Sequence, residues 1–215
     1  TLTTGANNVF IGCRAGRLAD EVHSNIFIGE CAGCSTVCGS GVGCQGDTNI
    51  YIGHEAAKTA TTAFENIVIG DRALSAGAFT GKRNIFMGWE SGCSKTEGEY
   101  NVFFGNGTGS ESTTGKANTL IGGLSGRKLS TGCYNTFIGS YAGYGAPSSG
   151  GSGHCNTAVG LSSLYCLTSG NDNTAVGRSA GRLTSSGSDN TFLGHCAGNT
   201  NTTGSNNVAI GCNVE

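Results

Sequence analysis

The 215-residue sequence lacks several features that most globular proteins have. It contains one proline, Pro147, against 39 glycines, and only 12% of its residues are charged. No window places apolar residues at the i, i+3, i+4 and i+7 spacing for long enough to bury one face of a helix, so a helical fold is excluded. Apolar runs are a handful of residues long, far short of the roughly 20 needed to cross a bilayer, so we expect no membrane insertion.

Charge is scarce and nearly balanced. Lys and Arg number 12 and Asp and Glu number 14, which leaves no basic stripe to neutralise a phosphate backbone, and we expect no nucleic-acid partner. A net charge of −2 with 37% hydrophobic residues is also unlike a disordered chain. Five Asp in the whole sequence exclude a calcium-binding nonapeptide solenoid, which needs an Asp in every turn.

What the sequence does contain is a repeat. An asparagine, a short apolar run and a glycine four residues later recur from end to end, and eight of the eleven intervals between copies are 17 residues. Such a period predicts an all-β fold, a parallel β-solenoid of about twelve 17-residue coils that forms a single repeat domain over residues 1–215. At about 4.8 Å per stacked strand the rod is roughly 55–60 Å long. We expect this stretch to be a segment of a longer fibre chain.

Side-chain direction within each copy follows from the two-residue period of a strand. With the asparagine as position 0, position 3 is apolar in all twelve copies and position 1 is Val, Ile or Thr, so both are expected to face the core. Position 2 points the other way and is rich in aromatic residues, which predicts a seam between the chains of an elongated homotrimer. The expected seam residues are Phe10, Phe27, Tyr51, Phe86, Phe103, Phe137 and Phe192.

The repeated asparagines are expected inside the coil as a ladder of side-chain amides. An unpaired buried amide costs about 1–3 kcal/mol, whereas a ladder satisfies its donor and its acceptor at once. The twelve asparagines are Asn8, Asn25, Asn49, Asn66, Asn84, Asn101, Asn118, Asn135, Asn156, Asn173, Asn190 and Asn207.

Copies such as NTFIGSYAG, NTAVGRSAG and NTFLGHCAG resemble the repeats of bacteriophage tail fibres and, more distantly, the head repeats of trimeric autotransporter adhesins. The resemblance implies a homotrimeric fibre or spike in the virion, assembled in the host cytoplasm, with other phage tail proteins and a host surface glycan or outer-membrane protein as partners. We expect no enzymatic activity and no cofactor.

Recognition residues are expected on outward corners and on the loops that break the 17-residue period, at 34–47 and 144–154, because insertions cannot enter a stacked core. Flat amphipathic side chains suit contact with sugars or proteins. The candidates for receptor binding are Trp89, Tyr141, Tyr144, Pro147 and His154.

Eleven cysteines are many for a chain assembled in a reducing cytoplasm, where thiols stay free. Cysteines in neighbouring coils occupy adjacent rather than equal positions, which disfavours disulfides. One group, Cys31, Cys34, Cys38 and Cys44, lies within a single loop and could hold zinc or an iron–sulfur cluster; the alternative is that the Gly- and Ser-rich loop needs no metal.

Three alternative functions remain open from sequence. A glycan depolymerase would use a carboxylate pair among Glu30, Glu55 and Glu90 at the corners. A bacterial surface adhesin would share the repeat. Ice binding is suggested by threonine at position 1 of five consecutive copies, although these hydroxyls are expected inside the coil, on the same face as position 3.

Overall fold

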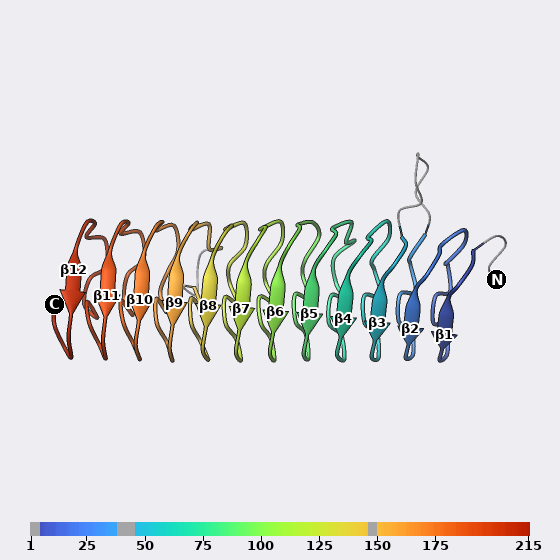
Figure 1. The fold of residues 1–215 in the computed structure, drawn as a ribbon, viewed down its shortest axis with the longest axis horizontal. Helices are drawn as coiled ribbons and strands as arrows, with labels where there is room; N and C mark the ends of the chain where they lie inside the picture. The colour runs from blue at the N-terminus through green and yellow to red at the C-terminus, as the bar shows by residue number, and fades with distance from the viewer. Residues whose placement is uncertain (1–4, 38–45, 146–149) are drawn as a thin grey trace.

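The chain forms a straight rod of stacked coils, as Figure 1 shows. The structure is a computed structural model that describes residues 5–37, 46–145 and 150–215. Each coil contributes one short strand. The strands are β1 (Val9–Ile11), β2 (Ile26–Ile28), β3 (Ile50–Ile52), β4 (Ile67–Ile69), β5 (Ile85–Met87), β6 (Val102–Phe104), β7 (Thr119–Ile121), β8 (Thr136–Ile138), β9 (Thr157–Val159), β10 (Thr174–Val176), β11 (Thr191–Leu193) and β12 (Val208–Ile210). The fold is therefore an all-β parallel solenoid.

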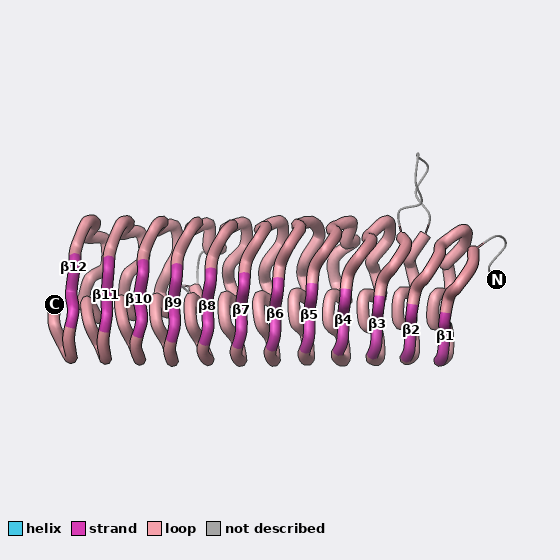
Figure 2. The backbone as a smooth tube through the Cα atoms, in the orientation of Figure 1, coloured by secondary structure: helices cyan, strands magenta, loops and turns pink. Residues whose placement is uncertain are grey.

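All twelve strands belong to one parallel sheet in which each strand pairs with the next along the chain. The pairing is in register, so equal repeat positions stack on one another, as Val9 does on Ile26. Turns and loops make up the rest of each coil (Figure 2), and they also pair from coil to coil, for example Cys31 N donating to Cys13 O at 2.9 Å. Each strand is three residues long, shorter than a typical strand, because chain corners flank it on both sides.

The two faces of the sheet are the reverse of the sequence-based expectation. Position 2 lies inside the coil: Phe27, Phe86 and Phe103 are fully buried within one chain. Positions 1 and 3 point outward, and Ile11 and Leu193 are 57% and 46% exposed. The expected seam is therefore wrong, because these aromatic side chains fill their own solenoid; Phe10 in the first coil is partly buried and the other six are fully buried. The residues concerned are Phe10, Phe27, Tyr51, Phe86, Phe103, Phe137 and Phe192.

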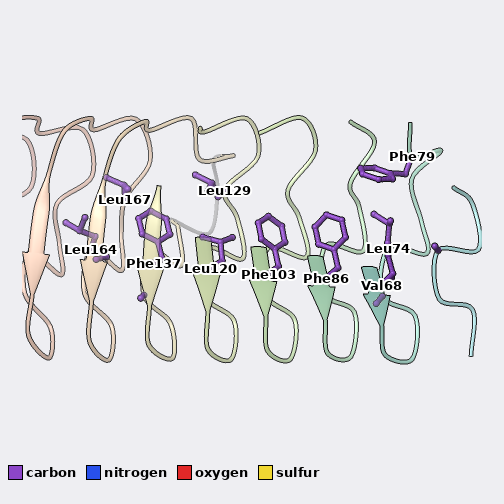
Figure 3. Packing of buried hydrophobic residues seen from close by; sticks show 14 of the residues in the cluster. Val68, Leu74, Phe79, Phe86, Phe103, Leu120, Leu129, Phe137, Leu164 and Leu167 are labelled. Carbon is purple, nitrogen blue, oxygen red and sulfur yellow. The ribbon is translucent and has the colours of Figure 1, made fainter. Parts of the chain in front are cut away.

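Shape complementarity inside the coil explains why position 2 turns inward. Where position 2 is Phe, position 8 is Gly; a Cβ at Gly92 would approach the Phe86 ring at 2.8 Å. At Val68 and Ala158, where position 2 is small, position 8 is a buried leucine, Leu74 or Leu164. Figure 3 shows Val68, Leu74, Phe86 and Leu164 among the side chains in the interior. The space between positions 2 and 8 therefore holds one large side chain in these coils, which comes either from the strand or from the opposite wall. The β10 coil differs, because Ala175 is combined with Gly181 and the space at Gly181 is bounded by Leu164 and Phe192 of the neighbouring coils.

The motif asparagines form a continuous ladder through the rod. In every link the Oδ1 of one asparagine accepts two hydrogen bonds from the asparagine of the next coil, from its backbone N at 2.8–3.1 Å and from its Nδ2 at 2.8–3.2 Å. The second amide hydrogen goes to a backbone carbonyl, as Asn101 Nδ2 does to Gly115 O at 3.1 Å. All the motif asparagines except Asn8 and Asn207 at the two ends are buried.

Glycine at position 4 is required by both conformation and contact. Gly105 has φ +142°, a region that residues with a side chain rarely adopt. A Cβ there would also lie 2.8 Å from the carbonyl carbon of Gly122, the equivalent residue of the next coil. This glycine stack lets the chain turn out of the strand while neighbouring coils keep their close spacing.

The complementarity between positions 2 and 8 is testable by moving the large side chain from position 2 to position 8. Phe103→Ala alone should destabilise the protein by about 3–5 kcal/mol, since it leaves a cavity. Gly109→Leu alone should also destabilise it, because a Cβ at Gly109 meets the Phe103 ring. The double variant reproduces the combination of Ala158 with Leu164. Its loss of unfolding free energy should be clearly smaller than the sum of the two single losses, as measured by denaturant unfolding. Strictly additive losses would contradict the shared-volume interpretation.

Candidate functional site

The outer face of the sheet is a continuous strip that includes all twelve strands. Positions 1 and 3 of the twelve strands line it, and all of them are Ile, Val, Thr, Leu, Met or Phe, without a single charge. With twelve strands about 4.8 Å apart and three residues of about 3.3 Å each, the strip covers on the order of 500 Å². That is at the upper end of the largest apolar patches on monomeric proteins. The strip thus has the character of an interface.

A second feature is a row of side chains at position 9 of four successive coils. Arg127, Tyr144, Tyr165 and Arg182 belong to the coils of β7, β8, β9 and β10 and stack in that order; we call this row the arginine–tyrosine ladder. The two tyrosine rings are parallel, with centroids 5.0 Å apart and 3° between their planes. The Arg127 and Arg182 guanidinium carbons lie 5.9 Å and 5.5 Å from the centroids of the adjacent rings.

In-register stacking of the backbone sets this arrangement. Lys128 N donates to Tyr144 O and Cys166 N donates to Arg182 O, so each coil holds its position-9 residue one strand spacing from the next. Tyr141, at position 6 of the β8 coil, leans on the row with its centroid 5.7 Å from that of Tyr144. Arg127 Nη1 also donates to the Tyr144 hydroxyl at 3.1 Å. The ladder is therefore pre-ordered rather than a set of independent surface side chains.

The residues expected to bind a receptor are dispersed except for two. Tyr141 and Tyr144 meet in the cluster just described. Trp89, 42% exposed, lies on another coil with the Arg72 guanidinium 5.4 Å from its ring, and His154 accepts a hydrogen bond from Cys133 N at another corner. Pro147 lies outside the described residues, as does part of each period-breaking loop.

Sequence reasoning missed Tyr165, Arg127 and Arg182. The signal was present, because all three fall at position 9 when the copies are aligned on their asparagines. Tyr144 and Tyr165 are 21 residues apart, since the intervening coil carries an insertion. Their alignment therefore escapes a search at the 17-residue period.

The cysteines form no disulfide in the described part of the chain, where nine are present as free thiols. Cys31 and Cys34 lie in one coil beside a cavity of about 260 Å³ that Arg14, Arg17 and Lys58 also line. Burial raises the pKa of the Cys34 thiol, which opposes the thiolate form that a metal needs. Within the described ranges no group of three or more metal-binding side chains occurs. Cys38 and Cys44 lie outside those ranges, so the four-cysteine site stays a prediction.

The corner carboxylates are engaged by cations. Glu55 is 2.5 Å from Lys58 Nζ, and this hydrogen bond lowers the pKa of the Glu55 carboxyl. Glu90 pairs with Arg72 at 2.7 Å. A glycosidase acid needs a raised pKa at the scissile bond. The geometry at these two residues therefore gives no support to a depolymerase.

Lys95 is an unusual interior residue. It is fully buried at position 11, where other coils carry Leu129 or Leu167. Its Nζ donates to Ser112 Oγ at 3.1 Å and to Gly115 O at 2.5 Å, and lies 5.7 Å from the centroid of the Phe103 ring. Burial nevertheless lowers the pKa of this ammonium to about 7.

Comparison of the chain with protein-family models, with curated proteins and with solved structures finds no match. Among the described residues no helix is long and apolar enough to cross a membrane. The functional argument therefore starts from the surfaces of this solenoid.

Lys95 makes stability depend on pH in a predictable direction. The unfolded chain, with an ordinary lysine pKa of 10.5, binds this proton up to a higher pH than the folded chain, whose Lys95 has a pKa of about 7. Stability therefore rises between about pH 7 and 10.5 and is lowest below pH 7. Lys95→Met should remove this rise and stabilise the protein at pH 6 by a few kcal/mol at most. Denaturant unfolding at several pH values measures it, with exposed Lys116→Met as the control. A stability difference between Lys95→Met and wild type that stays constant from pH 6 to 10 would contradict the assignment.

Proposed function

We propose that this chain is part of a homotrimeric bacteriophage tail fibre, a rigid rod that contributes to attachment to the host cell surface. The observation that carries the proposal is the uncharged outer face of the sheet, which runs the full length of a straight solenoid and would give three identical chains a surface to share. The resemblance of the repeats to tail-fibre repeats suggests the trimeric assembly and the role in a virion. The fibre would be assembled in the host cytoplasm, and the nine free thiols among the described residues are compatible with a reducing compartment.

The trimer seam in this proposal consists of positions 1 and 3, not of the buried position 2. Interface cores are depleted of charge and rich in apolar residues, and the outer strip meets both conditions. Three parallel strips facing one axis would remove the apolar surface from water by a closed, symmetric arrangement. In-register coils give each chain the same axial repeat, so contacts made at one level recur at the next.

Attachment in this proposal is multivalent. A trimer presents each outward site three times around one axis, and linked weak sites bind with an avidity well above that of one site. The partners would be other phage tail proteins along the fibre and a host surface glycan or outer-membrane protein. The corners and loops opposite the seam remain available for these contacts.

A charge in the strip tests the seam. Ile138→Asp, on the outer face of β8, should prevent assembly because three carboxylates would meet in an apolar seam. Ser140→Asp, an exposed corner residue two positions along the same coil, should leave the assembly intact. Native mass spectrometry measures both: we expect three times the chain mass for wild type and Ser140→Asp and a single chain mass for Ile138→Asp. A monomeric wild type would refute the trimer.

A second candidate function, ice binding, gains support from one observation. Thr119, Thr136, Thr157, Thr174 and Thr191 stand at position 1 of β7 to β11 and point outward, not into the coil as expected. Together with the aliphatic residues at position 3 they form a flat, regularly spaced array of hydroxyls and methyls. Such an array can order water into an ice-like layer.

Ice binding and trimerisation compete for the same strip, so one experiment separates them. If the strip binds ice, the monomer should show thermal hysteresis, and Thr157→Tyr in the middle of the threonine row should abolish it because the side chain breaks the flat surface. Ser140→Asp is again the control. Absence of thermal hysteresis in the wild-type protein would remove this candidate.

A further inference from the structure

The arginine–tyrosine ladder has the chemistry of an anion-binding surface. The outer faces of the Tyr144 and Tyr165 rings are covered by guanidinium groups and the inner faces by each other, so these rings present edges and hydroxyls outward. Aromatic edges carry partial positive charge, and the hydroxyls can donate hydrogen bonds. A tyrosine hydroxyl is protonated at neutral pH, and burial raises the pKa of Tyr165 further above that range.

At one end of the ladder, a positively charged guanidinium is available to bind an anion. Arg182 is exposed and forms no ion pair with any carboxylate in the described ranges. Arg127 at the other end shares Glu111 with Lys128, at 3.3 Å and 3.7 Å, so two cations oppose one carboxylate there. The row therefore carries a net positive charge along its length.

Other arginine–aromatic contacts on the rod differ in this respect. Arg83 lies 5.7 Å from the Tyr100 ring but is neutralised by Glu65 at 2.6 Å. Arg72 lies near Trp89 but is paired with Glu90. The arginine–tyrosine ladder is thus distinguished by a guanidinium whose hydrogen-bonding edge no acidic side chain of the described residues occupies.

The spacing of the ladder suits a linear polymer. One side chain per coil gives a donor about every 4.8 Å along the rod, close to the rise per sugar of an extended polysaccharide. Guanidinium groups bind carboxylates through paired N–H donors. We propose that the arginine–tyrosine ladder, with Tyr141 beside it, binds a carboxylated polysaccharide laid parallel to the rod axis. This inference rests on the proposed host-attachment function and names the chemistry of the surface that is bound.

The test measures binding of the wild-type protein to three immobilised carboxylated polysaccharides, polygalacturonate, alginate and polysialic acid, with neutral dextran for comparison. We expect binding to at least one of the three, none to dextran, and weakening as salt is raised. Arg182→Gln and Tyr165→Phe should each raise the dissociation constant about tenfold, the loss expected when one charge-assisted or buried hydrogen bond is removed.

Two matched variants exclude a general effect of charge or of hydroxyl loss. Arg178→Gln removes an arginine that is also exposed, at another corner of the β10 coil, and Tyr134→Phe removes the hydroxyl of an exposed tyrosine. Both should bind as wild type does. Failure of wild type to bind all three acidic polymers, equal binding to dextran, or an equal loss in Arg178→Gln would each overturn the inference.

The outcome is separable from that of the fibre proposal. A trimer that does not bind any of the acidic polymers overturns the inference and leaves the fibre intact. A monomer that binds them through Arg182 supports the ladder and refutes the trimer.

Discussion

The structure depends on one constraint, the in-register stacking of every coil on its neighbour. The asparagine ladder enforces it, since each Oδ1 accepts hydrogen bonds from the backbone N and the Nδ2 of the next asparagine. A coil displaced by one residue would leave buried amides unpaired, at a cost of about 1–3 kcal/mol each. Because the ladder passes through all twelve coils, equal repeat positions stack on one another from Asn8 to Asn207. Extra residues therefore leave the coil at its corners, and asparagine stays at position 0 in all twelve copies, as glycine does at position 4.

Stacking also fixes the shape of the interior. Neighbouring coils can come no closer than their backbones allow, and glycine at position 4 sets that distance. Within the fixed cross-section, a side chain from the strand wall and one from the opposite wall share a single volume, which is why Phe86 faces Gly92 and Ala158 faces Leu164. Lys95 occupies the same kind of space with a titratable group. Its hydrogen bonds and the nearby ring replace only part of the hydration that the ammonium loses on burial. The charged form is therefore less favourable than in water, and the pKa is lowered.

The sequence predicted the period, the parallel solenoid and the asparagine positions, because these follow from a spacing that repeats. It did not predict which face of the strand is inside. Both faces are apolar, so hydrophobicity could not decide, and the uniformity of position 3 was misread as burial. The deciding information was the pairing of position 2 with position 8, large with small, which is visible only when two distant positions of one coil are compared. Likewise Tyr165 joins Tyr144 only after the 21-residue coil is aligned on its asparagine.

An in-register solenoid turns any outward position into a linear array, and this determines how such a rod can acquire function. Opposite charges in successive coils neutralise each other, as Glu65 and Arg83 do, and such a row contributes little to binding. A row that departs from alternation, as Arg127 to Arg182 does, keeps its charge and its donors. The outer strip lies at positions 1 and 3 and the ladder at position 9, on different faces of the coil. Because no residue belongs to both, a chain could bury the strip in an assembly and still present the ladder to a ligand.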